Sequence, residues 1–126
     1  MTRSITGFYE RDGLDWYVEQ PRVVWALANQ EPSLDYGSVV DPCAGAGVIP
    51  KVFRQKGFYT EGWDIKDRFG CLTGQYDFLH GPQPPYKPDH IVSNPPYFGG
   101  QGSQLFVQQA LQTANRSVHI LTTLQF

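Results

Sequence analysis

The sequence lacks the features that would place it in several specialised classes of protein. It has two cysteines, Cys43 and Cys71, too few for a disulfide framework, and its three histidines show no metal-ligand spacing. It has no run of about 18 apolar residues, as a membrane span requires, and no basic-then-apolar start typical of an export signal. We therefore expect a cytoplasmic protein with no metal site and no membrane association.

Charge of either sign is also scarce. Ten basic and 12 acidic residues give a formal net charge of −2, so no overall positive field attracts the protein to nucleic acid. This balance neither identifies a substrate nor excludes DNA. The 126 residues suffice for one domain, spanning 1–126, but not for a catalytic domain and a separate recognition domain.

Apolar periodicity predicts strands that alternate with helices. Buried strands are expected at 38–40, 58–63, 89–93 and 117–124, with a weaker strand within 71–76. Helices are expected at 22–30, from Ile49 to a stop at Gly57, and at 105–114 with Val107, Ala110, Leu111 and Ala114 facing inward. This alternation predicts an α/β domain with a parallel sheet and right-handed crossovers.

The tetrapeptide Asn94-Pro95-Pro96-Tyr97 follows the fourth strand and is the most informative motif. Two adjacent prolines have no backbone N–H, so the turn offers carbonyl acceptors and almost no donors. Asn94 adds a side-chain carbonyl and Tyr97 an aromatic face. The motif predicts a site for a planar group that carries an NH2, although a rigid surface turn or a polyproline ligand has similar residues.

A glycine-rich loop follows the first strand at residues 41–47, Asp41-Pro42-Cys43-Ala44-Gly45-Ala46-Gly47. Gly45 and Gly47 allow backbone to lie against a ligand, and the next helix begins with unpaired N–H groups facing it. A dinucleotide-binding loop has a similar pattern, but its third glycine is replaced here by Pro50.

Asp64 ends the second strand, 23 residues after Asp41. This spacing suits an acidic side chain at the tip of the neighbouring parallel strand, within reach of ribose hydroxyls. An aspartate in a turn is the alternative interpretation. We assign Asp64 to cofactor binding.

With this loop ahead of it, the tetrapeptide resembles the signature of the amino-group branch of the S-adenosylmethionine-dependent methyltransferases. The resemblance implies a Rossmann-like fold with strand order 3-2-1-4-5, catalytic residues at 94–97, and cofactor binding by the loop residues Asp41, Pro42, Cys43, Ala44, Gly45 and Gly47. It also implies that Asp77 and Phe78 hold the adenine of the cofactor, although Phe78 suits a core position equally well. Residues 16–21, with Tyr17 and Pro21, resemble the segment that covers the methionine end of the cofactor, or aromatics that pack a helix onto the sheet.

Family members with this motif methylate adenine N6 in DNA or RNA, other base amines, or a glutamine amide of release factors. The order of the motifs most resembles small adenine methylases, so DNA is the expected substrate, with RNA or protein as alternatives. A non-catalytic cofactor-binding module and a dinucleotide-dependent oxidoreductase are alternatives of other classes.

The regions after the tetrapeptide carry two further expectations. Residues 98–102, rich in glycine, are expected to form a flexible loop that folds over a bound base. A family sheet continues beyond strand five with a helix and a hairpin, which this chain lacks, so we expect an incomplete C-terminus. An uncovered fifth strand would favour self-association through its edge.

Overall fold

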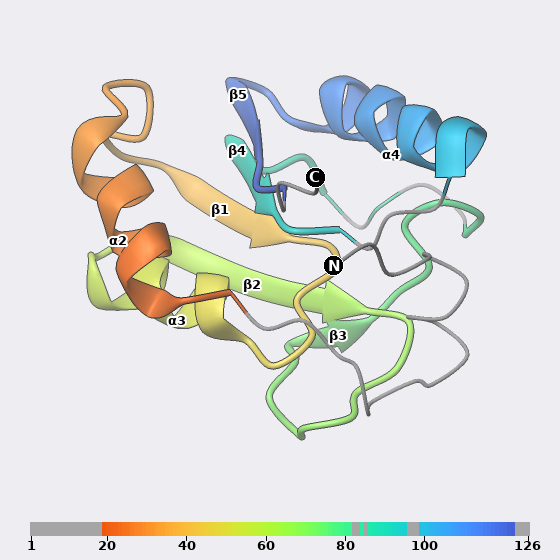
Figure 1. Cartoon of the computed structure of the whole chain (residues 1–126), viewed down its shortest axis with the longest axis horizontal. Helices are drawn as coiled ribbons and strands as arrows, with labels where there is room; N and C mark the ends of the chain where they lie inside the picture. The colour runs from red at the N-terminus through yellow and green to blue at the C-terminus, as the bar shows by residue number, and fades with distance from the viewer. Residues whose placement is uncertain (1–18, 82–83, 85, 96–98, 123–126) are drawn as a thin grey trace, which may run out of the picture.

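The computed structural model describes residues 19–81, 84, 86–95 and 99–122 (Figure 1). Within these residues, no helix is long and apolar enough to cross a membrane. The elements in chain order are α2 (Pro21–Gln30), β1 (Ser38–Asp41), α3 (Val48–Gln55), β2 (Tyr59–Asp64), β3 (Gly74–Gln75), β4 (His90–Ser93), α4 (Gly99–Thr113) and β5 (Ser117–Ile120).

The five strands form one parallel sheet in the order β3-β2-β1-β4-β5, as predicted. β1 lies in the centre, with Asp41 opposite Gly62 of β2 and Val40 opposite Ile91 of β4. The chain therefore moves to one side of β1 after the first crossover and to the other side for β4. In sheets of this kind the carboxyl ends of the strands at this reversal form a ligand crevice.

One face of the sheet is covered by α2 and α3 (Figure 1). Val24 and Ala28 of α2 and Ile49 and Phe53 of α3 are at most 3% exposed. They pack with Val39 and other sheet residues in one apolar cluster. Fully burying each large side chain stabilises the fold by about 1.5–3 kcal/mol, so this cluster anchors both helices firmly to the sheet.

The opposite face is covered by α4 and by aromatic side chains. Phe106 of α4 packs against Phe78, with ring centroids 5.2 Å apart. The ring centroid of Trp63 in β2 lies 5.5 Å from that of Tyr76 and 6.0 Å from that of Tyr86. The rings of Tyr76 and Tyr86 cover β2 on this face. The described part of the connection between β3 and β4 contains no helix, consistent with its prolines.

Two predictions about α4 are wrong. The helix already begins at Gly99, so residues 99–102 are helical and do not form a loop. Val107 and Leu111, expected to face inward, are 39% and 63% exposed, whereas Phe106 is 1% exposed. Ala110 is fully buried and Ala114 packs against the core, as predicted, so periodicity placed only part of the inward face. β5 ends at Ile120, earlier than predicted, and residues 123–126 lie outside the described residues.

Gly62 provides a test of how tightly β2 packs beneath the glycine loop. A Cβ at this position would lie 2.9 Å from both Ala44 Cβ and Pro50 Cγ. We expect Gly62→Ala to lower the free energy of unfolding by about 1–3 kcal/mol, because the loop and α3 must shift to relieve the overlap. Urea denaturation measures this change.

Gly74→Ala in β3 is the matched control, since its Cβ would meet only Trp63 Cδ1, at an ordinary contact distance of 3.9 Å. Equal stability of the Gly62 variant and the wild type would contradict this close packing.

Candidate active site

β1, β2 and β4 end along one edge of the sheet (Figure 1), and each of them ends in a polar residue. Asp41 is the last residue of β1, Asp64 of β2 and Ser93 of β4. Asn94 follows Ser93 directly. This carboxyl edge is where parallel α/β sheets bind their ligands, so it is the candidate active site.

Asp41 is the most buried of these groups, with 1% of its surface exposed. Its Oδ1 accepts hydrogen bonds from Ser93 Oγ at 2.6 Å and from the backbone N–H of Cys43 at 3.0 Å. Its Oδ2 is buried and has no hydrogen-bond partner among the described residues. Burial raises the pKa of Asp41 well above its ordinary range, and nearby Glu19 and Asp64 raise it further, against the lowering effect of the Ser93 bond.

The glycine loop turns back onto the end of β2. Gly45 and Gly47 have φ of 54° and 84°, in the left-handed region that glycine adopts at no steric cost. Gly47 caps the start of α3, and the backbone N–H of Ala44 donates to Trp63 O at 2.8 Å. Pro42 is buried, and burial raises the pKa of the Cys43 thiol well above its usual range, so this thiol is neutral.

Asp64 joins β2 to this loop. Its Oδ2 accepts from the backbone N–H of Gly45 at 2.9 Å, and its Oδ1 accepts from the N–H of Ile65 at 2.7 Å. Burial raises the pKa of Asp64, although the side chain remains partly accessible. Each carboxylate oxygen retains a further lone pair for a ligand hydroxyl. Ile65 beside it is 63% exposed and offers an apolar surface at the same edge.

Asp77 and Phe78 differ in accessibility, because the Asp77 side chain is 39% exposed, with its Oδ2 3.6 Å from His80 Nδ1, and Phe78 is buried. Oδ1 of Asp77 accepts from the backbone N–H groups of Leu79 and His80, at 3.2 and 3.0 Å, and so stabilises a local turn. Phe78 is 3% exposed and packs in the core against Phe106. The side chain of Phe78 therefore occupies a core position, the alternative that the sequence left open. Its ring has almost no exposed surface for a ligand.

Asn94 lies against Glu19, from the segment that leads into α2. Its Nδ2 donates to Glu19 Oε2 at 3.2 Å. Burial raises the pKa of Glu19, while the bond from Asn94 lowers it. Asn94 and the following Pro95 are both partly buried. The structure thus brings Asn94 next to Ser93 and Asp41, and so next to the start of the glycine loop.

Of the other predicted residues, only Pro21 is described, and no described contact joins it to this group. Pro96, Tyr97 and Tyr17 lie outside the described residues, and Pro21 is the exposed first residue of α2. Sequence reasoning missed Glu19 and Ser93. Ser93 could have been found, because it ends the strand beside β1 and the buried carboxylate of Asp41 needs a hydrogen-bond donor. The pairing of Glu19 with Asn94, 75 positions away, has no sign in the sequence.

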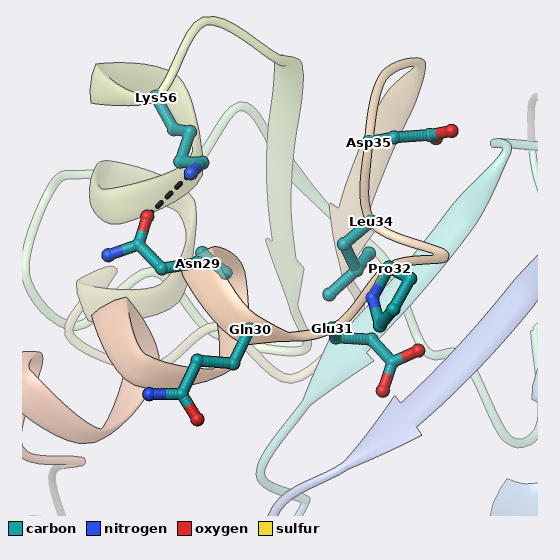
Figure 2. A pocket seen from close by; sticks show the side chains of 8 residues that line it. Asn29, Gln30, Glu31, Pro32, Leu34, Asp35 and Lys56 are labelled. Carbon is teal, nitrogen blue, oxygen red and sulfur yellow. Dashed lines mark hydrogen bonds between the residues drawn. The ribbon is translucent and has the colours of Figure 1, made fainter.

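A surface hollow of about 320 Å³ lies at the opposite edge of the sheet, where α2 leads into β1 (Figure 2). It is lined by residues 28–32, Leu34, Asp35 and Lys56, and Lys56 Nζ donates to Asn29 Oδ1 at 2.5 Å across it. None of its lining residues belongs to the carboxyl-edge group. We do not assign the active site to this hollow.

Comparison with known proteins supports the fold. No protein-family model and no curated protein sequence matches the chain. Its structure is similar to that of Thermoplasma acidophilum 1320, with a TM-score of 0.61 and 16% identity over 82% of this chain and 59% of that one. It is also similar to TehB from Haemophilus influenzae, with a TM-score of 0.55 and 17% identity over 86% of this chain and 41% of that one.

The chain therefore spans roughly half the length of these two proteins. At such low identity the likeness concerns the fold alone. Taken with the strand order, it establishes that the chain has an α/β, Rossmann-like fold with a parallel five-stranded sheet.

Asp41 is expected to destabilise the ligand-free protein at neutral pH. Its pKa is raised on folding, so its contribution to stability is greatest below the pKa of the unfolded chain, about 3.9, and is lost as the pH rises through the folded value. Asp41→Asn keeps an acceptor for Ser93 and Cys43 but carries no charge. We expect it to raise the free energy of unfolding at pH 8 by about 1–3 kcal/mol, because it removes the additional desolvation penalty of a buried charge.

Urea denaturation across pH measures this gain, which should shrink toward acid pH. Asp35→Asn, at an exposed carboxylate of lowered pKa, is the control and should bring no gain. A less stable Asp41→Asn protein at pH 8 would show that the buried charge is compensated within the fold.

Proposed function

We propose that the chain is an S-adenosylmethionine-dependent N-methyltransferase that acts on an exocyclic amino group, with adenine N6 in DNA as its substrate. One observation carries the proposal: the hydrogen bond of 2.6 Å between Ser93 and Asp41. It joins the residue before Asn94 to the residue that begins the glycine loop. The acceptor groups of residues 94–95 therefore lie beside the loop that would hold a methyl donor.

The residues at the carboxyl edge fit such a donor. S-adenosylmethionine, when bound, supplies a methyl group on a positively charged sulfur, and transfer leaves the electron pair of the broken S–C bond on that sulfur. Oδ2 of Asp41, which has no partner in the described part of the chain, is suited to a cationic or hydrogen-bond-donating ligand group. Asp64 would accept from ribose hydroxyls, and Ile65 would pack on an apolar ring.

The acceptors of residues 94–95 address the chemical difficulty of an exocyclic amine. Its nitrogen lone pair is delocalised into the ring, so the amine is a weak nucleophile. The side-chain carbonyl of Asn94 and the backbone carbonyl of Pro95 would each accept one N–H and direct the lone pair toward the methyl group. Positioning of this kind lowers the barrier by holding the reactants in near-attack geometry. The nitrogen gains an N–C bond and then releases one proton to solvent.

DNA adenine is the proposed substrate because the motif order resembles that of small adenine methylases. A base in a duplex must leave the stack to reach the acceptors, at a cost of a few kcal/mol. RNA base amines and the glutamine amide of a release factor present the same NH2 and are the competing substrates. The net charge of −2 leaves all three open.

Cofactor binding can be measured directly by calorimetry. We expect S-adenosylmethionine to bind and NAD to give no heat. Asp64→Ala should weaken binding at least tenfold, since a hydrogen bond to a charged group contributes about 1.5–3 kcal/mol. Asp35→Ala, at the opposite edge of the sheet, is the matched control and should bind as the wild type does. Binding of NAD instead would favour an oxidoreductase.

Methyl transfer can be followed with a tritiated methyl group on DNA, RNA and a release factor. We expect label on DNA, and a rate about 10²–10³ lower for Asn94→Ala, as when a single positioned polar group is removed from an active site. Affinity for S-adenosylmethionine should change by no more than about threefold, because Asn94 acts on the substrate amine. Binding without transfer to any substrate would identify a non-catalytic cofactor-binding module.

A further inference from the structure

The contact between Asn94 and Glu19 determines which end of the asparagine amide faces the active site. An ionised carboxylate has acceptors only, so the amide group that meets Glu19 Oε2 at 3.2 Å must be the NH2. The carbonyl end then has no hydrogen-bond partner among the described residues. A substrate amine needs this end, because its own N–H groups require acceptors.

We propose that Glu19 is a positioning residue that fixes the amide orientation of Asn94 and switches methyl transfer off when it gains a proton. The inference rests on the proposed function and adds a regulated step to that site. A protonated Glu19 carries an O–H donor, so Asn94 can turn its carbonyl toward it. The NH2 then faces the substrate, where two donors oppose each other and the lone pair is no longer directed.

Glu19 is held firmly enough to act in this way. It is separated from α2 only by Gln20, whose carbonyl accepts from the N–H groups of Val23 and Val24 at 3.0 and 3.3 Å. Val24 is fully buried in the core beneath the sheet. The carboxylate is therefore attached to a packed helix end, and its position relative to Asn94 does not depend on a free loop.

The surroundings of Glu19 favour uptake of a proton at a higher pH than an exposed glutamate requires. Burial raises the pKa of Glu19 above its ordinary value. Among the described residues, Asp41 at the end of β1 interacts electrostatically with Glu19, and Asp64 at the end of β2 acts on Asp41 in turn. With a raised pKa, the active ionised form exists above that pKa and is lost as the pH falls through it. Methyl transfer should therefore decline on the acid side with the titration of Glu19.

Nuclear magnetic resonance of the free protein tests the pairing without any activity. The side-chain amide signals of Asn94, assigned from their loss in Asn94→Ala, should shift with pH at the same midpoint as the carboxyl carbon of Glu19. In Glu19→Gln that pH dependence should disappear. Asn94 signals that stay constant while Glu19 titrates would overturn the proposal, whether or not the protein transfers methyl groups.

Single-turnover kinetics test the consequence for transfer. Glu19→Ala leaves the amide unheld, so we expect the rate to fall about 10- to 100-fold, with an unchanged dissociation constant for S-adenosylmethionine. Glu19→Gln holds Asn94 in either orientation, so the rate should fall only about twofold, in proportion to the competent fraction, and its acid limb should be lost. Glu31→Gln, at the far end of α2, is the charge-matched control and should keep both rate and acid limb.

The outcomes separate this inference from the proposed function. A wild-type protein that transfers no methyl to any substrate contradicts the proposed function. The nuclear magnetic resonance titration still decides whether Glu19 controls the Asn94 amide. A Glu19→Ala rate within twofold of the wild type overturns the positioning role. A parallel loss of cofactor affinity and rate also overturns it, because Glu19 would then hold the cofactor.

Discussion

The hydrogen bond between Ser93 and Asp41 is the contact on which the active edge of this protein depends. β1 and β4 pair along two residues only, Val39 and Val40 with His90 and Ile91. The side-chain bond continues this pairing beyond the backbone ladder, to the place where the chain leaves the sheet on both strands. It fixes the start of the glycine loop relative to Asn94 and Pro95, although Asp41 and Ser93 are 52 residues apart in the sequence.

This bond lies in surroundings that are unfavourable for charge. Three carboxyl groups, of Glu19, Asp41 and Asp64, are partly or fully buried at one edge, and burial raises the pKa of each. A fold that needed only stability would place apolar residues here, because buried carboxylates cost free energy unless they are paired. Local conflicts of this kind are characteristic of functional sites, where a ligand supplies the missing partner.

Much of the fold was predictable because its strands are short, apolar and bounded by turn residues. Val39 and Val40, for example, follow Gly37 and Ser38 and precede Asp41, and they lie in the central strand. The face of α4 was not predictable in this way. Phe106 is buried because the sheet and Phe78 lie beneath it, and Leu111 is exposed because nothing described covers it, yet both are apolar residues on one helix. Periodicity ranks the faces of a helix but does not show where its neighbours are.

The site was predictable where its residues are neighbours in sequence, and not where folding brings them together. The glycines of the loop and the acid at the end of β2 could be placed from their spacing, and the bond from Gly45 to Asp64 agrees with that placement. The contact of Glu19 with Asn94 depends on α2 packing across the sheet, so its existence is a property of the core and not of either motif.

These contacts also mean that the loop and the acceptor turn are not independent. Asp41 binds Ser93 directly, interacts electrostatically with Glu19, and is joined through the loop to Asp64. A change in the charge of Asp41 therefore changes its hydrogen bond to Ser93 and the protonation of Glu19. Ser93 precedes Asn94 in the chain, and Glu19 accepts from the side-chain amide of Asn94. A ligand group that neutralises Asp41 therefore also affects Asn94 and Pro95. By thermodynamic reciprocity, a group bound by Asn94 and Pro95 affects Asp41. Asp41 is thus the group through which the carboxyl edge is connected, by its bond to Ser93 and its electrostatic interactions with Glu19 and Asp64.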